Sequence, residues 1–138
     1  MKKVRRRSGK AGLPPGTIIT VDDEDIGEHA AHLFTYNKDS LVESALTSLK
    51  DFALPDPGHS TTWINIAGLS NLELLTEVST LFDLHPLMVE DILNFDHRPK
   101  LEEYPKNIFV VAKMLALDGS TGDVTSEQVS FVLGKGYL

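Results

Sequence analysis

Two adjacent carboxylates, Glu90 and Asp91, are the residues in this sequence whose type best suits a chemical role. Hard divalent cations prefer carboxylate oxygen, and Mg²⁺ usually keeps several waters while it accepts one or two carboxylates. Successive residues of a helix point about 100° apart, so the two side chains cannot both face a core. At least one of them is therefore presented outward, either to a bound cation or as part of a plain acidic helix face.

The segment from residue 85 to residue 100 is expected to hold this pair on a short helix. Pro86 has a fixed φ and no N–H to lose, which suits the first helical position. Arg98 precedes a proline, and a residue in that position is disfavoured in the α region. We therefore predict a helix from residue 86 to about residue 95, with His85 supporting its start rather than binding metal.

The usual catalytic motifs are absent from the sequence. It contains no cysteine, no nucleophile elbow, no glycine-rich phosphate loop and no paired histidines at helical spacing. The five histidines are scattered, and each is expected to be a surface or capping residue. Without thiolates, a bound metal must rely on oxygen or imidazole ligands. We therefore expect that the chain is not an enzyme.

Length and composition predict one globular domain. The 138 residues are 41% hydrophobic, which is enough to bury a core. The longest apolar run, residues 108–117, is interrupted by Lys113 and is shorter than the roughly 20 residues that span a bilayer. The N-terminus lacks the apolar segment of a secretory signal. We expect that none of these residues crosses a membrane.

Charge is distributed unevenly along the chain. The first ten positions hold six of the 13 basic residues and no acid, which leaves seven basic and 20 acidic residues in the remainder. Such an acidic body favours cations and disfavours nucleic acid. Residues 1–12 are expected to form a basic flexible arm, either solvated or touching an anionic partner, and residues 13–138 to form the domain. The acidic run 22–25 lacks the spacing and glycine of a calcium loop and is expected to be a solvated turn.

Hydrophobic periodicity predicts an α/β fold. Strands are expected near residues 18, 33, 63, 110 and 129, and helices over 41–49, after a capping box at Ser70 and over 86–95. Residues 118–123 are predicted to turn one strand back on the next as a hairpin. The result is a mixed β-sheet flanked by helices, an α/β/α sandwich. Because the last five residues resemble a turn entering a strand, we expect the domain to be truncated before its final strands.

Several motifs resemble the N-terminal cytoplasmic domain of the CorA family of divalent-cation channels. The segment HPLMVEDILNFDHRPKLEEYPKNIFVVAKML carries the family's His-Pro-Leu, Glu-Asp-Ile and Arg-Pro-Lys in the same order and spacing, followed by a hydrophobic strand. Gly-Leu-Pro-Pro-Gly at 12–16, Trp-Ile-Asn-Ile at 63–66 and Glu-Gln-Val-Ser at 127–130 are also similar to family segments. The resemblance covers most of the chain.

The resemblance implies a regulatory metal site. In CorA-type channels the positions matching Glu90 and Asp91 lie between cytoplasmic domains of neighbouring subunits and help to bind Mg²⁺, Co²⁺ or another divalent cation. Complementary acids come from a long stalk helix, and a backbone carbonyl of the N-terminal arm, in this chain that of Leu13, is also used. Bound cation holds a homopentamer closed, and its loss at low cytosolic Mg²⁺ favours conduction. The partners implied are thus the chain's own stalk and membrane domain and the neighbouring subunits.

Other features of the family are absent from these 138 residues. They contain no stalk, no membrane helices and no Gly-Met-Asn pore signature, so we expect a Mg²⁺-sensing and gating portion that cannot itself conduct. The parent protein would then lie in the cell (inner) membrane, with this portion on the cytoplasmic side and truncated before the stalk. A related Zn²⁺ transporter and a stand-alone α/β binding domain are the alternatives.

Overall fold

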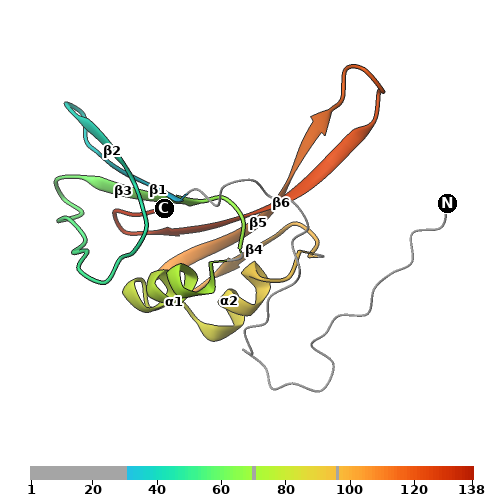
Figure 1. Cartoon of the computed structure of the whole chain (residues 1–138). Coiled ribbons are helices and arrows are strands. Elements are labelled where there is room, and N and C mark those ends of the chain that lie inside the picture. Colours follow the sequence, from blue (N-terminus) through green and yellow to red (C-terminus); the bar gives the residue numbers. More distant parts are fainter. Residues whose placement is uncertain (1–30, 70, 96) are drawn as a thin grey trace.

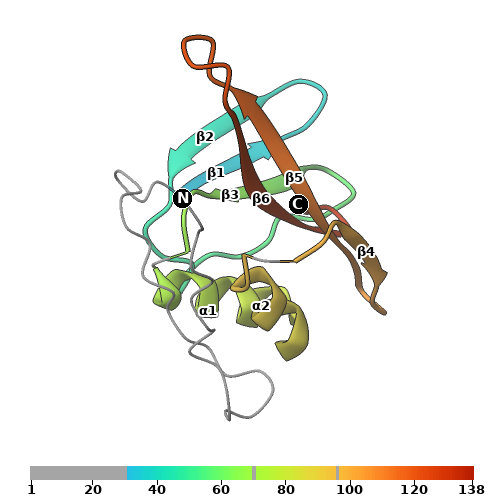
Figure 2. The same cartoon turned by 90° about the vertical axis from the view of Figure 1, so that its right-hand side faces the viewer.

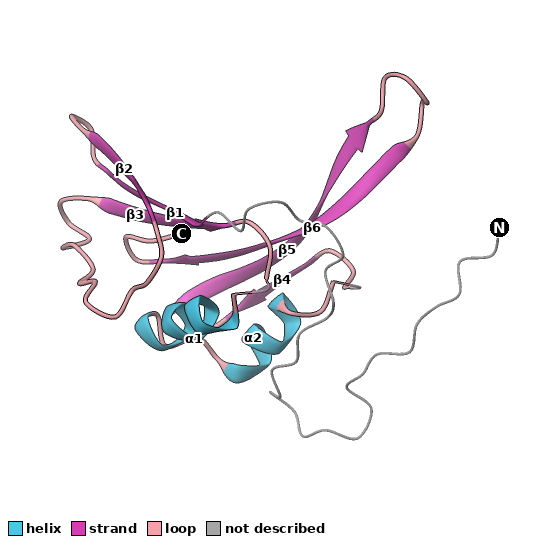
Figure 3. Cartoon of the chain, in the orientation of Figure 1, coloured by secondary structure: helices cyan, strands magenta, loops and turns pink. Residues whose placement is uncertain are grey.

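The computed structural model describes residues 31–69, 71–95 and 97–138. Along the sequence its elements are β1 (Ala31–Tyr36), β2 (Leu41–Ala45), β3 (Thr61–Ile66), α1 (Leu72–Leu81), α2 (Pro86–Ile92), β4 (Lys100–Glu103), β5 (Asn107–Leu117) and β6 (Val124–Gly134) (Figure 1, Figure 3). The basic arm 1–12, the strand predicted near residue 18 and the acidic run 22–25 lie outside the described residues.

The strands form two antiparallel three-stranded sheets, ordered β2-β1-β3 and β4-β5-β6. The end of the chain connects them, because Thr62 of β3 forms a parallel bridge with Tyr137. The amide of Ile64 donates to the carbonyl of Leu138, and the amide of Leu138 donates to the carbonyl of Thr62, both at 2.9 Å. Antiparallel and parallel pairing occur together, as predicted for a mixed sheet.

Helices α1 and α2 lie on the same side of the strands (Figure 1, Figure 2). The larger core packs both helices and the turn between them against β5, and it consists of Leu75, Phe82, Leu84, Met88, Val89, Ile92, Leu93, Phe109 and Val111. Met88 and Phe109 have no exposed surface, and burying side chains of this size contributes about 1.5–3 kcal/mol each. The predicted α/β class agrees with this arrangement, although the helices of the described residues cover only one face.

The predicted hairpin over turn 118–123 is confirmed, and its two strands differ along their length. Near the base of β5, Asn107, Phe109 and Val111 are buried in alternation, which places them on the face toward the helices. Beyond Lys113 every residue of β5 is exposed, and the outer part of β5 and β6 projects away from the body (Figure 1). The base of the hairpin therefore belongs to the core, and its tip does not.

The prediction of a helix over residues 41–49 is wrong, because residues 41–45 form strand β2. The side-chain oxygen of Asn37 accepts hydrogen bonds from the amides of Asp39 (2.8 Å) and Ser40 (2.9 Å), which closes a tight turn after β1. This turn returns the chain antiparallel to β1. Backbone pairing with a neighbouring strand overrides a weak local helical preference.

The two helices begin with different caps. The side chain of Asn71 accepts from the amide of Leu74 at 3.0 Å and caps α1, whereas Ser70, the predicted cap, lies outside the described residues. At α2, His85 Nδ1 accepts from the amide of Leu87 at 3.2 Å. The prediction that His85 supports the start of this helix is confirmed, and the helix ends somewhat earlier than predicted.

Candidate functional site

Helix α2 and strand β4 bring opposite charges together at the edge of the sheet. Asp91 lies on α2, and its Oδ2 atom is 2.6 Å from the Nζ atom of Lys100, the first residue of β4. The two side chains are only 22% and 24% exposed. Glu90, the other carboxylate of the predicted pair, is half-buried on the same helix. The Asp91–Lys100 ion pair therefore joins helix α2 to the edge strand β4.

Lys100 is shared between two carboxylates. Its Nζ atom also lies 2.8 Å from Oε1 of Glu102, and Glu102 Oε2 accepts a hydrogen bond from the hydroxyl of Tyr104 at 3.1 Å. The same Nζ atom is 5.4 Å from the centre of the ring of the buried Phe109, an arrangement that attracts a cation to the aromatic face. The ammonium group thus has a carboxylate on each side and an apolar surface below it.

His97 lies beside Asp91 as well. Its Nε2 atom is 2.9 Å from Asp91 Oδ1, an ion-pair distance, without the alignment of a hydrogen bond. Gln128 of β6 accepts from the amide of His97 at 3.2 Å and donates to the carbonyl of Asn94 at 2.8 Å. These two bonds fix the chain between α2 and β4, so His97 is a partly buried neighbour of Asp91 rather than the surface or capping residue expected.

The contacts of Lys100 shift the titration of three groups. Partial burial acts to lower the pKa of Lys100, but the hydrogen bonds to Asp91 and Glu102 outweigh it and raise this pKa above its usual 10.5. The hydrogen bond from Lys100 lowers the pKa of Glu102 below 4.5, and the bond from Tyr104 adds to this. Burial, followed by the bond to Glu102, raises the pKa of Tyr104 above 10.0. At neutral pH the group therefore holds a charged ammonium and an ionised Glu102.

An open, shallow depression separates α2 from β4, and it is lined by Leu87, Asp91, Glu102, Glu103 and Tyr104. Three of these five side chains carry a carboxylate, so the depression favours cations. Within the described ranges 31–69, 71–95 and 97–138, no three His, Cys, Asp or Glu side chains are grouped so that they could hold a metal ion by themselves. One or two carboxylates are the number that Mg²⁺ usually accepts, so these residues fit one share of a divalent-cation site.

The structure brings only part of the predicted site together. Glu90 and Asp91 lie on α2 as predicted, whereas Leu13 lies outside the described residues. Sequence reasoning missed Lys100 and Glu102, because β4 was not predicted as a strand. The signal that could have found them is their spacing, since residues two apart in a strand point to the same face.

Comparison with known proteins gives two matches. A family model described as a CorA-like Mg²⁺ transporter protein matches residues 58–138, which include α2 and β4. The cobalt/magnesium transport protein CorA of Thermotoga maritima is 36% identical over an alignment of 137 positions, and the match covers 95% of this chain and 37% of that protein. The chain thus spans little more than a third of the length of this relative.

Family membership bears on the expected function class. CorA proteins are ion transporters, which confirms the expectation that the chain is not an enzyme. Neither α1 nor α2, the helices of the described residues, has the length and hydrophobicity of a membrane-spanning helix. Since the family model matches more than half of its residues, this chain belongs to the CorA-like Mg²⁺ transporter proteins.

Proposed function

We propose that this chain is the cytoplasmic Mg²⁺-sensing portion of a CorA-like channel for Mg²⁺ and Co²⁺. It would gate the channel without conducting ions itself, and would assemble as a homopentamer with its own stalk and membrane domain attached. Its membership in the family and the name of the Thermotoga maritima relative support this function. The excess of acidic residues outside the first ten positions supports a cation as the ligand.

The observation that carries the proposal is the acidic depression beside α2. Asp91 borders it, and the Lys100 ammonium already lies between Asp91 and Glu102, so the oxygens at this edge are arranged around a positive charge. The lining offers carboxylates, and the sequence has no cysteine, which favours Mg²⁺ over the Zn²⁺ of a related transporter. We assign metal binding to Glu90 and Asp91, with the Leu13 carbonyl as a further ligand and the remaining acids from a neighbouring subunit.

Gating then follows from linkage between the ion and the arrangement of subunits. A bound Mg²⁺ would supply positive charge between carboxylates of two subunits. Without it, Asp91 and its acidic neighbours would repel the acids brought up by the partner, and that arrangement would lose population. The ion can shift the equilibrium only by its difference in affinity between the two arrangements.

Helices of the parent protein would also cover the second face of the sheet and complete the α/β/α sandwich.

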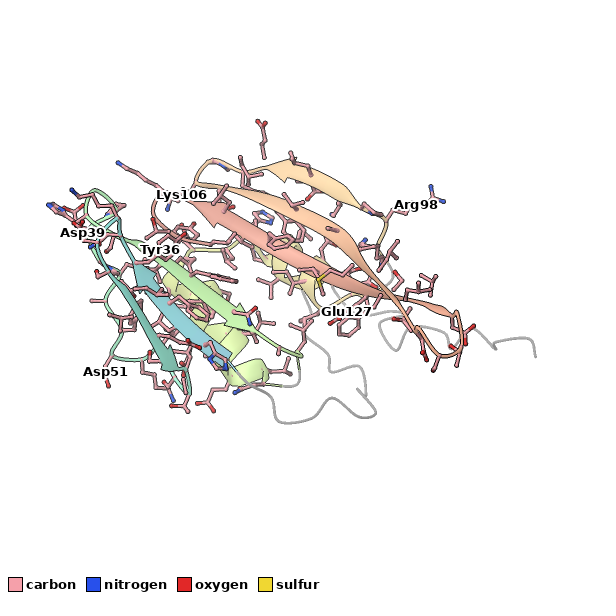
Figure 4. The ribbon with its side chains drawn as sticks, turned by 90° about the horizontal axis from the view of Figure 1, so that it is seen from above. Tyr36, Asp39, Asp51, Arg98, Lys106 and Glu127 are labelled. Carbon is pink, nitrogen blue, oxygen red and sulfur yellow. The ribbon has the colours of Figure 1, made fainter. Side chains whose placement is uncertain are left out.

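Isothermal titration of Mg²⁺ and Co²⁺ into the 138-residue chain tests the assignment. We expect weak binding, because half of the site is missing, and we expect this heat to disappear when Glu90→Ala and Asp91→Ala are combined. The matched control combines Asp123→Ala with Glu127→Ala, which removes the same charge from two exposed positions of the hairpin; Glu127 is labelled in Figure 4. Equal loss of heat in both double variants would reduce the effect to net charge and contradict the proposal.

A further inference from the structure

We propose that Lys100 is a built-in competitor of the divalent cation: it bonds both Asp91 and Glu102 in the metal-free state and stays with Glu102 alone when the ion binds. This inference rests on the proposed function, since it assigns a regulatory residue to the Asp91 site. It concerns how strongly the site binds, and not whether it binds.

The ammonium of Lys100 lies against the carboxylate that would bind the ion. Lys100 Nζ lies 2.6 Å from Asp91 Oδ2, the distance of a charge-assisted hydrogen bond. Mg²⁺ needs a carboxylate oxygen at about 2.0–2.1 Å and repels a neighbouring ammonium. Because Asp91 is only 22% exposed and His97 lies at its other oxygen, a cation cannot reach this carboxylate without disturbing Lys100 or His97.

Lys100 has a second carboxylate within reach. Glu102 Oε1 is 2.8 Å from Nζ, and the hydroxyl of Tyr104 holds the other oxygen of Glu102 in place. Lys100 and Glu102 lie on the same face of β4, so the ammonium can leave Asp91 without losing its remaining ion pair. The exchange therefore leaves no partly buried charge unpaired, which would otherwise be costly.

The neighbours of Lys100 hold its positive charge in place. The Lys100 ammonium lies 2.6 Å from Asp91 and 2.8 Å from Glu102, and the ring of the buried Phe109 is 5.4 Å from it. These neighbours hold a positive charge at the Asp91 carboxylate, and this charge lowers the affinity of the site for the ion. Such a low affinity suits a sensor whose ion is abundant.

Replacing the competitor gives the direct test. In Mg²⁺ titrations of the full chain, Lys100→Met is expected to raise the Asp91-dependent affinity roughly fivefold to tenfold, because it removes one hydrogen-bonded positive charge. Lys106→Met is the matched control: it removes the same charge from a lysine that pairs with Asp83, outside the depression, and it should leave the affinity unchanged. Equal affinities of Lys100→Met and wild type would overturn the inference.

Glu102→Gln tests the second half of the exchange. Lys100 would lose its alternative partner and hold Asp91 more firmly, so the affinity should fall a few fold, by an amount set by one partly exposed ion pair. In the Lys100→Met background the same substitution should have no effect. A fall that persists in that background would mean that Glu102 contacts the ion itself, which would contradict its role as the alternative partner of Lys100.

A measurement on the unaltered chain avoids any dependence on variants. The rate at which an acylating reagent modifies Lys100 is measured by mass spectrometry during a Mg²⁺ titration, with Lys106 as the internal reference. We expect the rate at Lys100 to rise as the ion releases the ammonium from its ion pair with Asp91. If Asp91-dependent binding occurs while this rate stays constant, the inference fails and the proposed function stands. If neither wild type nor Lys100→Met binds Mg²⁺, both fail.

Discussion

Two aspartate–lysine pairs join the α2 region to the β4 edge, and they differ in almost everything except distance. Asp91 and Lys100 approach to 2.6 Å, and Asp83 and Lys106 approach to 2.5 Å. The first pair is 22% and 24% exposed, whereas the second is 75% and 68% exposed. Arg98 precedes β4 and Lys106 follows it, so the two residues lie at opposite ends of this strand, and the Lys106 side chain extends toward solvent (Figure 4).

The surroundings of an ion pair decide how much it contributes to stability. Water and salt screen the exposed pair, so it contributes little to stability. Lys100 has in addition a second carboxylate, Glu102, and the buried ring of Phe109 near its ammonium. Lys100 is partly shielded and pairs with two carboxylates, so its charge can influence the Asp91 site, whereas the exposed Asp83–Lys106 pair contributes little.

Removing the apolar support should have the largest effect. Phe109→Ala is expected to lower the free energy of unfolding by about 3–5 kcal/mol, because it opens a cavity at a fully buried position. It should also admit water beside Lys100 and make this pair resemble the exposed one. Urea unfolding followed by circular dichroism measures the loss. Phe131→Ala is the control, since that ring is 40% exposed and its removal should destabilise the chain far less. Equal losses of stability would contradict a special role of Phe109 in supporting Lys100.

Removing each lysine compares the pairs directly. In Mg²⁺-free buffer, Lys100→Met is expected to destabilise the chain by about 1–2 kcal/mol, because it leaves Asp91 and Glu102 without their shared partner. Lys106→Met should leave the stability almost unchanged, because its pair with Asp83 is exposed to water and salt. Chemical denaturation of the two variants side by side gives both values, and similar losses would mean that the partial burial of Lys100 has no energetic consequence.

What the sequence could predict follows from how local the information is. The α2 helix and the 118–123 turn were predicted because His85, Pro86 and the turn residues act on their own neighbourhood. The helix over 41–49 was wrong because its apolar spacing suited a helix, while the Asn37 turn and pairing with β1 decided for a strand. Local periodicity carries no information about a partner strand.

The site divides in the same way. Glu90 and Asp91 could be singled out from residue type alone, and family resemblance gave them a role. The contact of Asp91 with Lys100 spans nine positions and a change from helix to strand, so it depends on Gln128 holding the intervening chain. No local pattern contains that information, which is why the competing ammonium emerged only from the structure.

The smallest effect concerns pH and separates the two pairs once more. Hydrogen bonding from Lys100 lowers the pKa of Glu102 below 4.5, and bonding from Lys106 lowers the pKa of Asp83 below 3.8. When the pKa of a carboxyl is lower in the folded chain, the unfolded chain binds the proton first as the pH falls. The stabilisation is therefore present above the pKa of the unfolded chain and is lost as the pH falls through the pKa of the folded chain. Because Glu102 is 40% exposed, its share is discounted to about 0.5–1 kcal/mol.

We therefore expect Glu102→Gln to flatten the loss of stability below about pH 4.5, as measured by urea unfolding at a series of pH values. Asp83→Asn should flatten this loss of stability less, and at lower pH. Added salt should abolish the contribution of Asp83 and leave most of the contribution of Glu102, since screening acts mainly on exposed charges. A Glu102 contribution that vanished in salt as readily as that of Asp83 would place both pairs in the same dielectric surroundings. The contrast between a shielded and a solvated lysine, on which the competitor role of Lys100 depends, would then be lost.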